Sequence, residues 1–142
     1  MAYESALGAL SELSARSLGV FRGRDAVDKH VSRKQLAALH SAGVVERMLP
    51  DTYRLAAVAR SHEQELRAAL LWAGAEAAAA GRSAAELYGL EGVSAATPEI
   101  VVPASRRVRG GNVVVHRAHN RAALMVRQVR GLRVTGAEAT LG

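Results

Sequence analysis

The chain has 142 residues, of which 49% are apolar and 23% are charged, so global disorder is excluded and one ordinary domain or two small ones can form. The absence of cysteine excludes disulfides and thiolate metal sites, and the net charge of +6 suits a polyanionic partner. Residues 1–10 do not resemble a signal peptide, and no run approaches the roughly 20 apolar residues of a membrane span. We therefore expect a cytoplasmic protein with no membrane partner.

The N-terminal part has the pattern of three short helices. Apolar spacing and the glycines that follow predict helices at residues 5–17, about 23–29 and 32–42. The third helix begins at a capping box, in which the Ser32 hydroxyl accepts from the amide of Gln35 and the Gln35 side chain reaches back.

A β-hairpin follows these helices. Short strands are expected at residues 44–48 and 53–55, joined by a turn at Pro50 and Asp51, because proline and aspartate favour turn positions. Three helices followed by a two-stranded wing is the order of a winged helix-turn-helix. The sequence thus predicts a DNA-binding domain over residues 1–57.

Residues 58–142 predict a second, small α+β domain with a mainly antiparallel sheet, so the whole chain belongs to the α+β class. Capping boxes that pair Ser61 with Gln64 and Ser83 with Glu86 indicate two helices. Residues 77–80 fit either a helix or a buried strand. β-rich runs predict strands at 99–103, 112–116, 125–128 and 133–135. Residues 139–142 look like a helix start, which leaves open whether this domain is incomplete at its C-terminus.

The start of the second helix of a helix-turn-helix meets base edges in the major groove. Arg33 and Lys34 can reach guanine or phosphate, and Gln35 can pair with adenine. Because Gln35 also closes the capping box, Arg33 and Lys34 are the stronger candidates. The alternative is a basic, solvated helix in a three-helix core. The complete set of candidate DNA-binding residues is Arg22, Arg24, Ser32, Arg33, Lys34, Gln35, Ser41, Arg47, Arg54, Arg106, Arg107 and Arg109.

The charge is unevenly distributed along the chain. Residues 1–60 carry nine Lys/Arg and six Asp/Glu, residues 61–100 carry two and six, and residues 101–142 carry eight and one. The loop at 104–111, with Arg106, Arg107 and Arg109, is therefore either a second phosphate contact or a solvated hairpin loop.

No arrangement typical of catalysis is recognisable. The chain has no phosphate-binding glycine loop and no evident pairing of a nucleophile with a base, so we expect neither an enzyme nor a cofactor. His116 and His119 follow a β-rich run, where positions three apart point to opposite faces, and no metal site is expected. His116 is interpreted as a sheet histidine whose ring has a hydrogen-bond partner.

In their order and spacing, several blocks resemble the AbiEi-like antitoxin family of type IV toxin–antitoxin systems, in its actinobacterial form. They are Gly19 to Phe21 with Val31-Ser32 and Tyr53-Arg54, then 83–90, Pro98 to Val102 with Val114 to Arg117, and finally 131–135 with 139–141. Relatives tend to have glycine at the position of His30 and in the wing turn, where this chain has Pro50, Asp51 and Thr52.

The resemblance implies a repressor of its own operon that acts on double-stranded DNA, and a partner toxin of the nucleotidyltransferase type. A homodimer stays open, since winged helices often bind palindromes as dimers. Two alternatives are a protein-interaction module that docks on a toxin or on a second copy, and the DNA-targeting half of a nuclease whose catalytic domain is absent.

Overall fold

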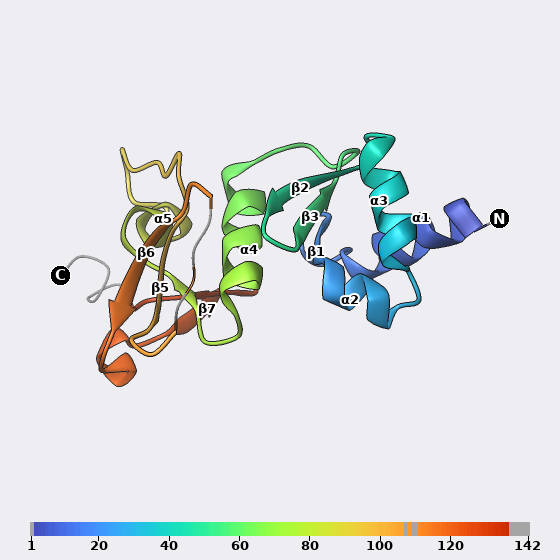
Figure 1. Cartoon of the computed structure of the whole chain (residues 1–142). Coiled ribbons are helices and arrows are strands. Elements are labelled where there is room, and N and C mark those ends of the chain that lie inside the picture. Colours follow the sequence, from blue (N-terminus) through green and yellow to red (C-terminus); the bar gives the residue numbers. More distant parts are fainter. Residues whose placement is uncertain (1, 107, 109–110, 137–142) are drawn as a thin grey trace. The chain divides into compact units, whose positions relative to one another are not determined.

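The structure, a computed structural model, describes residues 2–106, 108 and 111–136. It divides into two compact units, Met1–Trp72 and Ala73–Gly142, and each is described by itself (Figure 1). The α+β class is confirmed, with helices and sheets in both units. In this part of the chain no helix has the length and apolar character needed to cross a bilayer.

The first unit is built on one antiparallel sheet and its helices. In chain order it contains α1 (Ala2–Leu13), β1 (Val20–Arg22), α2 (Gly23–Asp28), α3 (Arg33–Ser41), β2 (Val45–Leu49), β3 (Thr52–Leu55) and most of α4 (His62–Ala73). The strand order is β1-β3-β2, so the predicted hairpin gains a third strand. Val20 and Phe21, expected to lead into the second helix, pair instead with Arg54 and Tyr53 of β3. This arrangement of three helices and a sheet is a winged helix-turn-helix.

The first helix ends at Leu13, earlier than predicted. The Ser14 hydroxyl donates to the carbonyl of Leu10, and the chain then turns through Leu18 and Gly19, both with positive φ. Gly19 needs to be a glycine for a second reason, since a Cβ there would lie 2.8 Å from Cγ2 of Val58. The backbone of this turn therefore packs closely against the Val58 side chain.

A single apolar cluster joins the helices α1 to α3 to the sheet. Leu36 and Leu39 insert one face of α3 into it, and both are almost completely buried. The other buried members are Ala6, Leu10, Phe21, Ala26, Val31, Val45 and Leu55. Removal of such side chains from water is the main stabilising contribution to a fold of this size. The rotation of α3 about its axis is thereby fixed.

The predicted capping box of the third helix is confirmed. The Gln35 amide donates to Oγ of Ser32 over 3.0 Å, and the Ser32 amide donates to Oε1 of Gln35 over 2.9 Å. His30 and Asp51, which lies in the wing turn, both adopt positive φ, at 68° and 53°. Glycine favours this left-handed region, and aspartate tolerates it better than most residues.

Helix α4 is attached to the turn between α1 and β1. Only half of the capping box predicted for it forms: Oγ of Ser61 accepts from the Gln64 amide. The Gln64 side chain is fully buried, and its Nε2 donates to the carbonyl of Leu18 over 2.9 Å. Arg67 donates to the carbonyl of Arg16. These bonds place most of α4 in the first unit, which therefore extends beyond the predicted boundary at residue 57.

The second unit contains a five-stranded sheet in the order β6-β5-β4-β8-β7. Its elements are β4 (Ala78–Ala79), α5 (Gly81–Leu87), β5 (Glu99–Pro103), β6 (Val114–Ala118), the 3₁₀ helix η1 (Arg121–Leu124), β7 (Arg127–Val129) and β8 (Leu132–Val134). Two pairings, β5–β6 and β4–β8, are parallel, and the other two are antiparallel. The sheet is therefore mixed, and the expectation of a mainly antiparallel sheet is wrong.

The structure answers two local questions that the sequence raised about this unit. The ambiguous run at 77–80 contains the central strand β4, whose two alanines are buried. The capping box predicted for Ser83 and Glu86 is wrong, because α5 begins earlier, at Gly81. Ser83 lies inside the helix, is buried, and accepts the amide of Glu99 through Oγ over 2.8 Å.

The Gln64 contact generates a stability prediction. Gln64→Ala is expected to lower the free energy of unfolding by about 2 kcal/mol, because it leaves the Leu18 carbonyl without its donor and opens a void. Urea denaturation of the full chain measures this change. Gln128→Ala, at an exposed position of β7, is the matched control and should stay within about 0.5 kcal/mol of the parent. Equal effects of the two variants would contradict a stabilising role of the contact.

Candidate nucleic-acid interface

The solvent face of α3 is basic at its start and small beyond. Arg33 and Lys34 are exposed at the first two positions of the helix, and one turn further along Ala37, Ala38 and then Ser41 are exposed as well. This i, i+4 spacing places the five residues on the side opposite Leu36 and Leu39. A helix with such a face can approach a polyanionic surface closely, because no bulky side chain stands in the way.

Arg33 has a partner in the wing turn that the sequence did not predict. Its Nη1 donates to Oδ1 of Asp51 over 2.5 Å. Oδ2 of the same carboxylate accepts the backbone amide of Arg24 over 3.1 Å, and the Asp51 carbonyl accepts the amide of Gly23 over 2.9 Å. One aspartate thus connects the wing turn to the first residues of α2 and α3. A carboxylate next to the proline of the predicted turn was the only signal for this role.

The pKa of Asp51 reflects these contacts. Burial acts to raise the pKa of this carboxyl, but the hydrogen bonds from Arg33 and the Arg24 amide, with the two positive charges, outweigh burial and hold the pKa below its ordinary value of 3.8. Arg33 in turn has a raised pKa, chiefly through its hydrogen bond to Asp51. Asp51 is thus a charged acceptor in this contact at neutral pH.

Gly23 allows the three elements to meet. A Cβ at this position would overlap both the Asp51 carboxylate and the Arg33 guanidinium. Gly23 is buried. A glycine is required at this position because of the close approach, and not because of its backbone angles.

The remaining candidates of the first unit differ in availability. Arg22 pairs with Asp25 over 2.8 Å, whereas Arg24 is largely exposed and only 3.8 Å from Asp51. Lys34 and Arg47 are exposed, and within the described residues neither side chain has a partner. Of the predicted DNA-binding cations in the first unit, Arg24, Arg33, Lys34 and Arg47 are therefore the exposed ones.

Arg54 has a structural place in the fold. Its side chain is only 7% exposed, and it donates to the Glu46 carboxylate and to the carbonyl of Val58 over 2.8 Å each. Arg54, which the sequence offered as a DNA-binding residue, lies in β3, the central strand of the sheet. Its guanidinium is thus engaged inside the first unit.

Only one of the three arginines predicted in the 104–111 loop can be placed. Arg106 donates through Nε to the carbonyl of Ala73, and its own carbonyl accepts from Arg117 over 3.2 Å. Arg107 and Arg109 lie outside the described residues. Arg106 and Arg117 are thus connected through the backbone carbonyl of Arg106.

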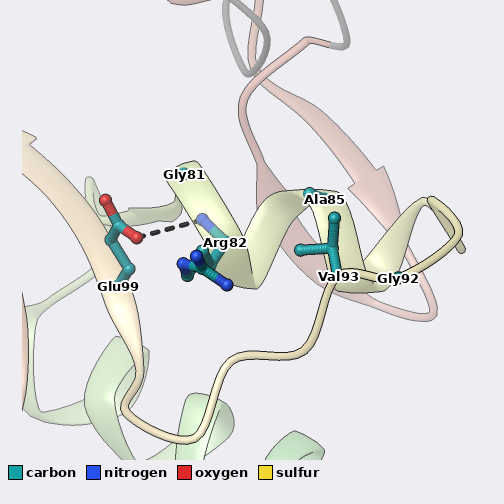
Figure 2. A pocket seen from close by; sticks show the side chains of 6 residues that line it. All are labelled: Gly81, Arg82, Ala85, Gly92, Val93 and Glu99. Atoms are coloured by element: carbon teal, nitrogen blue, oxygen red, sulfur yellow. Dashed lines mark hydrogen bonds between the residues drawn. The ribbon is translucent and has the colours of Figure 1, made fainter.

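A carboxylate also organises the second unit. Glu99 accepts the backbone amide of Arg82 at the start of α5 over 3.0 Å and contacts Nε2 of His116 over 2.6 Å. The expected ring partner of His116 is therefore present. Glu99 and α5 line an open depression of about 500 Å³. Figure 2 shows the Glu99 carboxylate directed at the first turn of α5, with Ala85 and Val93 farther from it. No cluster of metal-ligating side chains occurs among the residues that the structure describes.

The pKa of Glu99 is lowered. Burial acts to raise it, but the Arg82 amide and the His116 ring outweigh burial and hold the pKa below its ordinary value of 4.5. The charged carboxylate therefore stabilises the folded state. Its contribution is present above pH 4.5 and is lost as the pH falls through the folded-state pKa.

Comparison with known families agrees with the geometry of the first unit. Residues 9–56, which run from α1 to the end of β3, match the model of a family described as "Transcriptional regulator, AbiEi antitoxin". The match confirms the resemblance for the winged helix-turn-helix and supports a DNA-binding antitoxin in general; the family is one of regulators and not a class of enzymes. No curated protein matches the chain.

The acid dependence of Glu99 can be tested directly. Glu99→Gln is expected to lower the free energy of unfolding at neutral pH, and the difference from the parent should shrink as the pH falls below 4.5, where the parent carboxylate becomes protonated. Urea denaturation over a pH series measures it. The exposed Glu91→Gln variant controls for the loss of one charge. A difference that is independent of pH would refute the assignment.

Proposed function

We propose that the protein is a sequence-specific DNA-binding transcriptional regulator of the antitoxin type, acting in the cytoplasm. The observation that carries this proposal is the solvent face of α3, where Arg33 and Lys34 precede the small residues Ala37, Ala38 and Ser41. A major groove admits a helix, and a helix with small exposed residues can lie deep in it. The family match over residues 9–56 supports the same function.

In the proposed complex, Arg33 and Lys34 lie nearest the bases. Arg22, Arg24 and Arg47 contact phosphates, which position the protein without reading sequence. Ser32 and Gln35 remain engaged in their capping box, and Ser41 lies along the groove. Arg54 is left out of the interface, because Glu46 and Val58 occupy its guanidinium.

The second unit supplies the further parts of the proposal. Its basic loop, with Arg106, Arg107 and Arg109, adds phosphate contacts. The resemblance to AbiEi-like antitoxins supports repression of the protein's own operon and opposition to a toxin of the nucleotidyltransferase type. These parts depend on the resemblance, since residues 57–142 lie outside the family match.

The reading helix is tested by removing its two cations. Arg33→Ala/Lys34→Ala is expected to weaken binding to the upstream region of its gene by at least tenfold in a gel-shift assay, because base and phosphate contacts are both lost. Thermal unfolding should change little, since both side chains are exposed. Unchanged affinity would overturn the assignment.

The matched control removes two cations outside α3 and the wing. Arg16→Ala/Arg60→Ala lowers the net charge equally at exposed positions and should retain most of the affinity. For the parent, the logarithm of the affinity should fall with the logarithm of salt concentration by about 0.9 for each phosphate neutralised. A flat salt response would exclude DNA as the partner.

A second candidate function, docking on a protein partner, is favoured by the open edges of the second sheet. The strands β6 and β7 are the outer strands, and Val114 of β6 is 45% exposed. Such an edge can accept a strand from a toxin or from a second copy.

If β6 docks a partner, the parent should co-purify with a neighbouring gene product or form a homodimer in sedimentation. Val114→Lys should abolish this, because a charged outer strand resists pairing. A parent that shifts DNA but remains an unpartnered monomer would contradict this candidate.

A further inference from the structure

We infer that Asp51 is a specificity-determining positioning residue: it holds Arg33 in the orientation from which the guanidinium reads a base. The inference rests on the proposed function, since it assumes that α3 binds DNA. Asp51 does not touch the base itself. It acts through Arg33, from the neighbouring turn of the wing.

The carboxylate is itself held by the main chain. Its Oδ2 accepts the Arg24 amide over 3.1 Å, and the backbone carbonyl of Asp51 accepts the Gly23 amide over 2.9 Å. Oδ1 is left for Arg33. The acceptor that orients Arg33 is therefore attached to α2, which packs in the same core as α3.

The contact leaves the recognition edge of Arg33 available. Only Nη1 bonds to Asp51, and within the described part of the chain Nε and Nη2 have no partner. The side chain is 56% exposed, against 29% for Asp51. A guanidinium has five N–H donors in a rigid fork, and the free Nε–Nη2 edge matches the two acceptors O6 and N7 of guanine. Asp51 thus fixes the arginine without consuming the edge that would read a base.

The negative charge of Asp51 has a second effect. It offsets part of the attraction between Arg33 and any phosphate, which is independent of sequence. A base contact gains from the fixed orientation, because less side-chain freedom is lost on binding. Asp51 therefore raises the ratio of specific to non-specific affinity in two ways: it weakens the phosphate attraction of Arg33, and it fixes the orientation of Arg33 for a base contact.

Asp51→Asn tests this inference with little change of shape. The introduced amide keeps one acceptor oxygen for the two donors, Arg33 and the Arg24 amide, and it tolerates the positive φ of the turn. The parent protein is first used to select a preferred duplex from a randomised DNA pool. Affinities are then measured for that duplex and for a scrambled duplex of equal composition. We expect the ratio of the two affinities to fall about tenfold in the variant.

Two further variants separate positioning from charge and from a general effect on folding. Asp25→Asn removes the partner of Arg22, a carboxylate of the same 29% exposure, and should raise both affinities without changing their ratio. Gly23→Ala keeps all charges but places a methyl group where the carboxylate and guanidinium meet, and should lower the ratio as Asp51→Asn does. Thermal unfolding verifies that each variant is folded.

The double variant Arg33→Ala/Asp51→Asn completes the cycle. If Asp51 acts through Arg33, the aspartate substitution should not change the ratio further once Arg33 is absent. An unchanged ratio in Asp51→Asn would overturn the inference while leaving DNA binding intact. A parent that selects no preferred duplex would instead overturn the proposed function and, with it, this inference.

Discussion

The burial of Leu36 and Leu39 is the constraint on which the first unit depends. These side chains insert α3 into the apolar cluster that also holds α1, α2 and the sheet. Because a helix has one rotation that buries such a pair, the opposite face is determined at the same time. The basic start of α3 projects from the core for this reason. The burial of one face of the helix thus determines which side chains the opposite face presents to solvent.

Local signals predicted much of this unit. The capping box of Ser32 and Gln35 forms as expected, because both of its hydrogen bonds lie within one helical turn. The hairpin and its turn were also predicted from neighbouring residues. Strand β1 was missed, since its partners in β3 are 30 to 34 positions away along the chain and the run is only three residues long.

The features that the sequence did not predict are those that depend on distant partners. Arg54 was expected at the surface, but its place in the central strand brings it against Glu46 and Val58. Asp51 was assigned only to a turn, and its contact with Arg33 spans 18 positions of the chain. In the second unit one interpretation of the loop at 104–111 was a hairpin loop, whereas β5 and β6 run parallel. Residue types alone do not determine which of two strand directions is adopted.

The placement of β4 has a consequence for the order in which the units fold. Its two residues lie between β5 and β8, and Ala79 pairs with Ile100 on one side and Val134 on the other. The second sheet can close only after residue 134 has left the ribosome, whereas the first sheet is complete once Leu55 is available. Pairings between distant residues also close slowly, because the entropy of a long loop is lost before contacts form. During synthesis the winged helix therefore precedes the second unit as a folded structure.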